Sequence, residues 1–247
     1  MKKARALLLA LLIVATSCES ELTNESDVAQ KPAKVNIKGF STPNAVEIRL
    51  NGKPVIINDN SFYTQNIQTT INFVLDKGEK NPLAVYNHET GTQIANYEIT
   101  YDNIADYENF YFFNLPDIFL EVYAVKPSIN LGKVGFKFLF ANLGEFSGTE
   151  LESVKGILKR ENGAVLATFE NIGKDDFSEF KTYNFFSNTA PVFLELYKPG
   201  TTEPYAGTNP IKAKVIQTYG VNMIVLQEKQ ENGTVVIKGD IDIADYL

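Results

Sequence analysis

Apolar and polar residues alternate along most of the chain, which is the pattern of half-buried β-strands. In residues 45–57 (AVEIRLNGKPVII), Val46 and Ile48 alternate with polar neighbours up to the pair Asn51 and Gly52, and apolar residues resume after it. Asn-Gly readily adopts the positive φ that a type I′ turn needs. The pattern therefore predicts a β-hairpin at this position.

The same alternation predicts strands in both halves of the chain, and turn-rich segments such as DKGEKNP, ENG and KPGTTEP separate them. No window of helical length carries a convincing helical stripe. Many short strands with turns between them are typical of sandwiches and barrels. The further predicted strands are 34–40, 69–75, 83–87, 93–101, 109–113, 133–142, 153–160, 164–170, 190–197, 211–218, 221–228 and 234–238.

The two halves of the chain resemble each other. The strand, Asn-Gly turn and strand recur in residues 154–169 (VKGILKRENGAVLATF). Tyr63 and Phe73 then correspond to Tyr183 and Phe193, both at an offset of 120 residues. Several matches in one order indicate an internal duplication. The predicted fold is all-β, with two tandem Ig-like antiparallel β-sandwich domains, and a single larger sandwich is the alternative.

The N-terminus predicts an export signal. Basic residues precede ten apolar residues, Ala6 to Ala15, which suit a signal peptide and are too short for a membrane span. Ala15 and Ser17 are small residues at positions −3 and −1 before Cys18, and an ordinary signal peptidase would accept them before its cleavage point. The segment ATSC also resembles the lipobox of bacterial lipoproteins, with Ala15 where a larger aliphatic residue is usual. Both alternatives make residues 1–17 a signal peptide and Cys18 the first mature residue.

Cys18 is the only cysteine, so it cannot form a disulfide within the chain. Attachment of lipid to the thiol explains why the residue stands at the edge of the leader. The lipobox resemblance implies that Cys18 is the lipid-attachment residue and that its acyl chains connect the protein to a membrane.

Residues 18–33 predict a flexible tether, because this segment is acidic and has few bulky apolar side chains. Acidic residues directly after a lipid-bearing cysteine also resemble the surface-export signal of Bacteroidetes-type lipoproteins. A solvated spacer that is acidic by chance is the alternative.

The predicted mature chain is acidic. Removal of residues 1–17 takes away three of the 23 basic residues and leaves a net charge of −10. Nucleic acids and anionic membrane surfaces require basic patches. The composition therefore excludes both as expected partners.

The chemistry-bearing residues do not form a known catalytic or cofactor motif. His88 is the only histidine and lies in the polar turn YNHETG, so we expect an exposed turn histidine without a catalytic role. One histidine and one thiol, itself expected to carry lipid, do not supply a transition-metal site. No phosphate-binding or dinucleotide-binding motif is present. The sequence predicts no metal, no cofactor and no enzymatic activity.

Carboxylates gather in two short segments, which hold Asp102, Asp106, Glu108, Asp240, Asp242 and Asp245. Paired acids in a cleft can hydrolyse glycosides, and oxygen-rich loops can bind calcium. We instead interpret both segments as solvated strand edges, and in the second segment the alternation of Asp240 and Asp242 with Ile241 and Ile243 predicts that the isoleucines face inward.

Aromatic residues form two clusters, NFYFF (109–113) and YNFF (183–186). Exposed rings could stack on sugars or anchor a protein partner. Neighbouring residues of a strand point to opposite faces, so about half of each cluster must be core. We therefore interpret both clusters mainly as core packing.

Residues 34–55 (KVNIKGFSTPNAVEIRLNGKPV) resemble the opening of a poorly characterised domain family of Bacteroidetes-type cell-surface lipoproteins with tandem Ig-like domains. The Pro- and Gly-containing segment 126–132 places the domain limits at 34–126 and 127–247. The resemblance implies a lipid-anchored, surface-exposed outer-membrane protein without catalytic residues.

The expected function is binding, adhesion or assembly, with a protein or a glycan as ligand. A glycan-binding accessory lipoprotein is the alternative. A hydrolase that uses the carboxylates is a third class and requires two of them to converge in one pocket.

Overall fold

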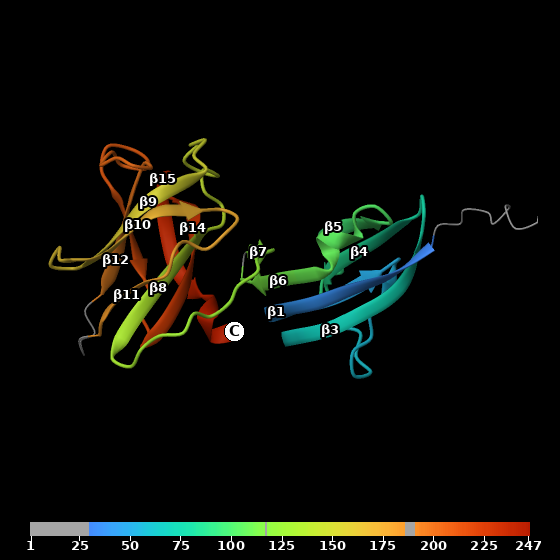
Figure 1. Ribbon diagram of the computed structural model, residues 1–247. Helices are drawn as coiled ribbons and strands as arrows, with labels where there is room; N and C mark the ends of the chain where they lie inside the picture. The colour runs from blue at the N-terminus through green and yellow to red at the C-terminus, as the bar shows by residue number, and fades with distance from the viewer. Residues whose placement is uncertain (1–29, 117, 186–190) are drawn as a thin grey trace, which may run out of the picture. The chain divides into compact units, whose positions relative to one another are not determined.

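The structure is a computed structural model that describes residues 30–116, 118–185 and 191–247 (Figure 1). Strands and two short 3-10 helices make up this part of the chain, which confirms the all-β fold class. The same residues include no helix with the length and apolar character needed to cross a membrane. The predicted signal peptide and Cys18 lie outside the described residues, and the last four residues of the expected tether already belong to the first strand.

Contacts between residues divide the chain into two compact units. Within the described residues, the first unit consists of residues 30–37, 46–62 and 68–110, and the second unit consists of residues 38–45, 63–67, 111–116, 118–185 and 191–247. The predicted domain limits at 34–126 and 127–247 and the Ig-like type of the domains stay predictions.

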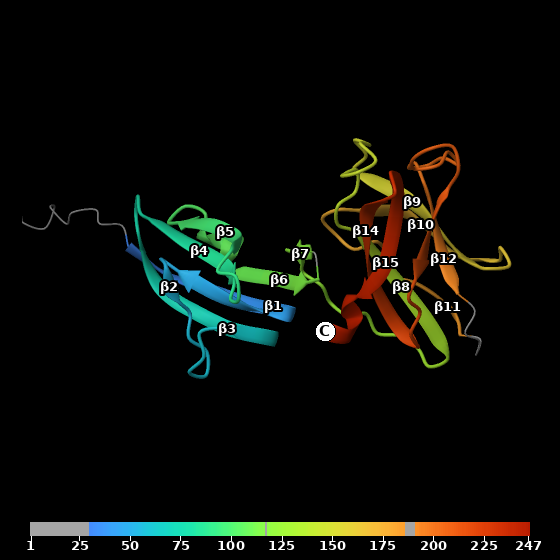
Figure 2. The same cartoon turned by 180° about the vertical axis from the view of Figure 1, so that it is seen from behind.

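The strands form two sheets, seen from opposite sides in Figures 1 and 2. The first sheet has the order β5-β4-β1-β6-β7, with β2 and β3 also paired to β1. Its elements, with the helix η1, are β1 (Gln30–Leu50), β2 (Lys53–Pro54), β3 (Tyr63–Asp76), β4 (Lys80–Asn87), β5 (Gln93–Thr100), η1 (Ile104–Tyr107), β6 (Asn109–Leu115) and β7 (Ile118–Leu120).

The predicted hairpin is present at the end of β1. Val46 and Ile48 are fully buried, and the residues between and after them are half-buried, as the alternation requires. Asn51 and Gly52 both have positive φ, 52° and 72°, and connect β1 to β2. The structure confirms this prediction because both central residues adopt the conformation of a type I′ turn.

β1 differs from its prediction by running unbroken from Gln30 to Leu50, where two strands separated near Pro43 were expected. The Ser41 hydroxyl donates a hydrogen bond to the Asn44 carbonyl oxygen at 2.6 Å. This local bond satisfies a backbone group in the proline-containing stretch, and the strand continues through it.

The second sheet has the order β10-β9-β12-β13-β15-β14-β8-β11. Its elements are β8 (Lys133–Phe140), β9 (Ser153–Arg160), β10 (Val165–Gly173), β11 (Lys181–Asn184), β12 (Val192–Tyr197), β13 (Ile211–Val215), β14 (Gly220–Glu231) and β15 (Thr234–Asp242), with the helix η2 (Ile243–Tyr246) at the end.

The second sheet folds over itself into a sandwich-like arrangement. A single described residue pair, Val215 with Gly239, joins β13 to β15. A Cβ atom on Gly239 would lie 2.8 Å from a Val215 methyl group, so glycine permits this close approach. Apolar residues of β8, β14 and β15 pack against those of β9, β10, β12 and β13 in one core, where Phe138 meets Phe169 edge-on with ring centroids 4.9 Å apart.

The residues matched between the two halves occupy different positions in the two sheets. Tyr63 and Phe73 share one strand, β3, whereas Tyr183 lies on β11 and Phe193 on β12. The internal duplication stays a prediction.

A buried carboxylate on β14 holds the loop between β8 and β9. Glu228 is 1% exposed, and its two oxygens accept hydrogen bonds from the amides of Gly144, Phe146 and Ser147 and from the Ser147 hydroxyl, at 2.7–3.2 Å. The Tyr205 hydroxyl also contacts this serine hydroxyl at 2.7 Å. A buried carboxylate is tolerated when its oxygens are satisfied in this way, and the loop thereby takes one conformation.

Glu228→Gln is expected to lower the free energy of unfolding by about 2–4 kcal/mol, because the amide nitrogen would face backbone donors and charge-assisted hydrogen bonds would be lost. Urea denaturation measures the effect. The exposed Glu150→Gln in the same loop is the matched control and should change the free energy by less than about 0.5 kcal/mol. Equal losses in the two variants would contradict the role of Glu228.

Candidate functional site

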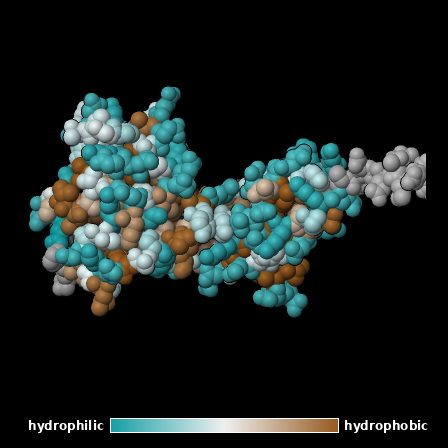
Figure 3. All heavy atoms as spheres, in the orientation of Figure 1, coloured by the Kyte–Doolittle hydropathy of each residue, from teal (hydrophilic) through white to brown (hydrophobic). Residues whose placement is uncertain are grey.

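Apolar side chains from three separate segments gather at the end of the second unit where β8 begins. Two of them are exposed to an unusual degree: Leu131 at 94% and Tyr219 at 56%. Figure 3 shows apolar atoms at the surface in this region, at the lower left of the view. We call the cluster the loop tip; its members are Leu131, Tyr183, Phe185 and Tyr219.

Hydrogen bonds connect the three segments of the loop tip. The Gly132 amide donates to the Tyr219 hydroxyl oxygen, and the Phe185 amide donates to the Gly132 carbonyl oxygen, both at 2.9 Å. The rings of Phe185 and Tyr219 meet edge-on, with centroids 5.3 Å apart and planes at 79°. Because each segment is bonded to another, the exposed ring of Tyr219 is held in place.

A fully buried asparagine organises the segment that carries Tyr219. Asn222 accepts hydrogen bonds from the amide and the hydroxyl of Thr218, at 2.6 and 3.0 Å. Its side-chain amide donates to the carbonyl oxygens of Gly135 and Thr218, at 3.2 and 3.1 Å. The buried amide thus uses its donors and its acceptor to hold Thr218, directly before Tyr219, and to join this segment to Gly135 of β8.

Tyr183 forms the inner layer of the loop tip. Its ring stacks with Phe136 of the core at 6.1 Å, and its hydroxyl donates to Gln217 at 3.2 Å. Burial raises the pKa of Tyr183 to about 12, so this tyrosine stays neutral at physiological pH. The core interpretation of the 183–186 cluster is therefore confirmed for Tyr183, while Phe186 lies outside the described residues.

The exposed part of the loop tip is uncharged. Residues 130–132, 184–185 and 216–220 contain no aspartate, glutamate, lysine or arginine. An aromatic surface edged by amide and hydroxyl groups suits a neutral ligand that has both apolar faces and hydroxyl groups.

The other predicted aromatic cluster belongs mostly to the core. Phe110, Phe112 and Phe113 are at most 6% exposed. Tyr111 packs against Tyr123 with ring centroids 4.7 Å apart. The structure confirms the core interpretation of residues 109–113.

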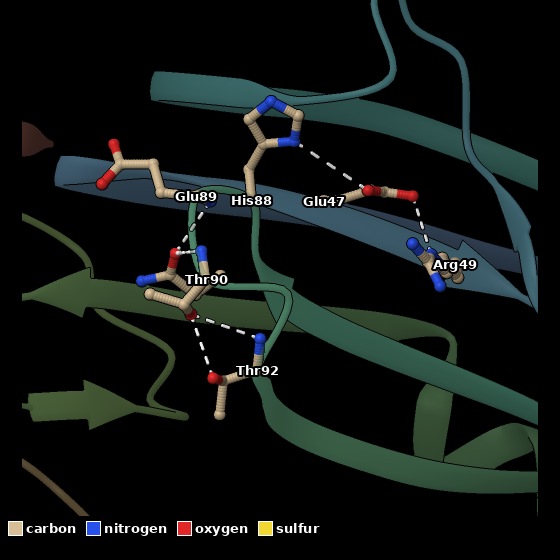
Figure 4. A network of polar contacts seen from close by, with 7 residues as sticks. Glu47, Arg49, His88, Glu89, Thr90 and Thr92 are labelled. Carbon is tan, nitrogen blue, oxygen red and sulfur yellow. Dashed lines mark hydrogen bonds and ion pairs between the residues drawn. The ribbon is translucent and has the colours of Figure 1, made fainter.

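His88 lies directly after β4 and has more contacts than an isolated turn histidine. Its side chain is 39% exposed, and its ring stacks on Phe62 with centroids 4.2 Å apart. Its Nδ1 atom lies 4.0 Å from a carboxylate oxygen of Glu47 (Figure 4). The sequence predicts the turn but not these two partners, which come from other segments.

The solvated-edge prediction is wrong for Asp242. This residue is 8% exposed, and one of its carboxylate oxygens accepts from the amides of Met223 and Ala244 at 2.8 and 2.9 Å. Burial raises the pKa of Asp242, and the two backbone hydrogen bonds oppose that shift. The alternation fails here because β15 ends at Asp242, which caps the helix η2. Asp240 is exposed, as predicted.

The sequence IADY occurs twice, at residues 104–107 and 243–246. Both copies form 3-10 helices after a strand, η1 after β5 and η2 after β15. Asp106 and Asp245 belong to these helices. The identical tetrapeptide is a sequence signal for strand termination that could have been found.

The structure also gathers carboxylates in a place that sequence reasoning did not identify. A depression of about 580 Å³ beside β10 is lined by Glu152, Glu170, Asp175, Asp176 and Glu179, together with Lys174. Within the described ranges, no group of three or more His, Cys, Asp or Glu side chains is arranged to hold a metal ion.

No protein-family model and no curated protein sequence matches the chain. The solved structures that resemble it include the crystal structure of CBMbc (family CBM26) from Eubacterium rectale Amy13K in complex with maltoheptaose, with 12% identity, 85% of this chain and 99% of that chain covered, and a TM-score of 0.23. Another is the Bacillus anthracis TIE protein, with 8% identity, 81% of this chain and 34% of that chain covered, and a TM-score of 0.25. Neither likeness identifies a function for this chain.

Asn222→Ala is expected to destabilise the protein by about 1–3 kcal/mol, because buried backbone groups lose their partners. It should also speed hydrogen exchange at the Thr218 amide, which bonds directly to Asn222. Exchange measured by NMR or mass spectrometry checks this. Asn209→Ala, at an exposed loop position, should leave exchange in residues 216–220 unchanged; the same acceleration there would contradict the assignment.

Proposed function

We propose that the protein is a non-catalytic glycan-binding module of the cell envelope and that the loop tip holds the glycan. One observation carries the proposal: Tyr219 is 56% exposed although its hydroxyl and its neighbouring backbone are hydrogen-bonded in place. A ring that is both rigid and exposed loses little conformational freedom when a ligand stacks on it.

The chemistry of the loop tip suits a neutral sugar. Pyranose rings have apolar C–H faces that pack on aromatic rings and hydroxyl groups at their edges. Gln217 and Thr218 place an amide and a hydroxyl beside Tyr219 in sequence, and the three segments carry no charge that would select an ionic ligand.

A protein ligand, in adhesion or assembly, is the second candidate. Leu131, which is 94% exposed, would supply an apolar contact for it. Specific binding of a protein together with absence of glycan binding would favour this candidate.

The proposal also includes a cellular location and a type of domain. Lipid on Cys18 would anchor the chain in the outer membrane, with residues 18–29 as part of a tether and the binding units exposed at the cell surface. The resemblance of residues 34–55 to Bacteroidetes-type surface lipoproteins supports this location and tandem Ig-like domains.

Tyr219→Ala is expected to weaken binding of neutral oligosaccharides by about five- to tenfold, because stacking on one aromatic ring contributes about 1–1.5 kcal/mol. Calorimetry with oligosaccharides from starch, cellulose, mannan and xylan measures the change. Tyr123→Ala removes a tyrosine that is 64% exposed outside the loop tip and should bind like the parent. Equal binding by Tyr219→Ala and the parent would contradict the site.

Cys18→Ser is expected to release the protein from membranes of its native host, because serine cannot form the thioether to lipid. Fractionation and intact mass measurement of the mature protein test this. Substitution of the neighbouring Ser17 by Ala keeps a small residue before the cleavage point and serves as the control. Membrane association of Cys18→Ser equal to that of the parent would rule out the anchor.

A further inference from the structure

A second cluster of aromatic and charged side chains lies in the first unit, on the side of β1 that faces away from Val46 and Ile48. It contains the only histidine of the chain and draws its members from β1, β4, the turn after β4 and the segment before β3. We call it the Arg49 patch; its members are Glu47, Arg49, Phe62, Tyr86 and His88.

Glu47 and Arg49 form a neutral pair of fixed geometry. The Nε atom of Arg49 donates to a Glu47 carboxylate oxygen at 2.7 Å (Figure 4), and its guanidinium lies 4.5 Å above the centre of the Tyr86 ring. The hydrogen bond from Arg49 lowers the pKa of Glu47, and the same bond raises the pKa of Arg49, so both stay charged. The opposite charges cancel, and the pair does not favour an ionic ligand.

The outer edge of the Arg49 guanidinium is available to a ligand. Arg49 is 38% exposed, and within the described residues no hydrogen bond or ion pair involves its two terminal nitrogens. These nitrogens are donors in a planar fork beside the Glu47 carboxylate, which is an acceptor. Neighbouring hydroxyl groups of a sugar can bond to such a donor and acceptor at the same time.

His88 adds a position for one further hydroxyl. Its Nδ1 atom is 4.0 Å from the second carboxylate oxygen of Glu47, which is too far for a direct hydrogen bond. An oxygen atom placed about 2.8 Å from both the Nδ1 atom and the carboxylate oxygen could form a hydrogen bond with each. The angle at this oxygen between its two partners would be about 90°. A hydroxyl group suits this position because it accepts from one partner and donates to the other.

The stacked pair of Phe62 and His88 supplies the apolar part of the patch. The two rings are nearly parallel, at 12°, and Phe62 is 44% exposed. An exposed ring next to a donor and an acceptor is the combination that recognises the C–H face and the hydroxyl edge of one sugar.

We propose that the Arg49 patch is a second glycan site, which takes a neutral sugar through two adjacent hydroxyl groups. The site extends the proposed glycan function to the first unit, and it rests on residues that the loop tip does not share. Two sites on one chain would bind a polysaccharide more tightly than either site alone where both engage the same polymer.

The test uses the full mature chain with Tyr219→Ala, so that binding at the loop tip is weakened. Starch, cellulose, mannan and xylan oligosaccharides are the probes, and each probe that binds is also offered after periodate oxidation and borohydride reduction, which destroys adjacent hydroxyl pairs. Arg49→Lys keeps the charge but removes the planar fork, and Glu47→Gln removes the carboxylate. Phe62→Ala removes the exposed ring.

Each of the three variants should weaken the remaining binding by about tenfold or more, and the oxidised probes should not bind. Glu98→Gln is the matched control, because it breaks an exposed ion pair with Lys80 in the same unit and should leave affinity unchanged. Thermal unfolding of each variant separates loss of the site from loss of the fold.

The outcomes distinguish the two sites. Remaining binding that Arg49→Lys, Glu47→Gln and Phe62→Ala do not change overturns the second site. Complete loss of binding in Tyr219→Ala alone also overturns it and leaves the loop tip in place. Binding that Tyr219→Ala leaves intact and Arg49→Lys removes supports the second site and contradicts the first. A parent chain that binds none of the probes contradicts both.

Discussion

Buried polar groups must find hydrogen-bond partners, and on β14 this constraint fixes the segment before the strand and the loop between β8 and β9. The side of β14 that faces the core of the second sheet carries Asn222, Ile224, Leu226 and Glu228. The two central residues are apolar, and the residue near each end is polar. The amide of Asn222 bonds the segment before Tyr219, and the carboxylate of Glu228 bonds the loop after β8. One strand thus anchors the core in its middle and positions surface loops at its ends.

The local structure could be predicted from the sequence wherever neighbouring residues decide it. The hairpin at Asn51 and Gly52 follows from the conformations that these residues tolerate, and the core role of residues 109–113 follows from their apolar character. Asp242 could not be predicted in the same way. Its burial depends on the Met223 amide from a neighbouring strand and on the change from strand to helix at this residue.

The candidate sites were harder to predict because they combine distant segments. The loop tip brings Leu131, Phe185 and Tyr219 together through hydrogen bonds that involve Gly132, a residue with no chemical signal of its own. The Arg49 patch joins Phe62 and His88 to β1. Single-sequence patterns describe each segment, but they do not contain the pairing that places one segment beside another.

The contact between Val215 and Gly239 also bears on self-association. Because it pairs β13 with β15, neither strand presents an open edge at that point, where another chain could add a strand. The two outer strands of the sheet are poor templates as well: β11 has four residues, and β10 carries two register irregularities. A sheet whose outer strands are short or irregular in this way resists edge-to-edge aggregation.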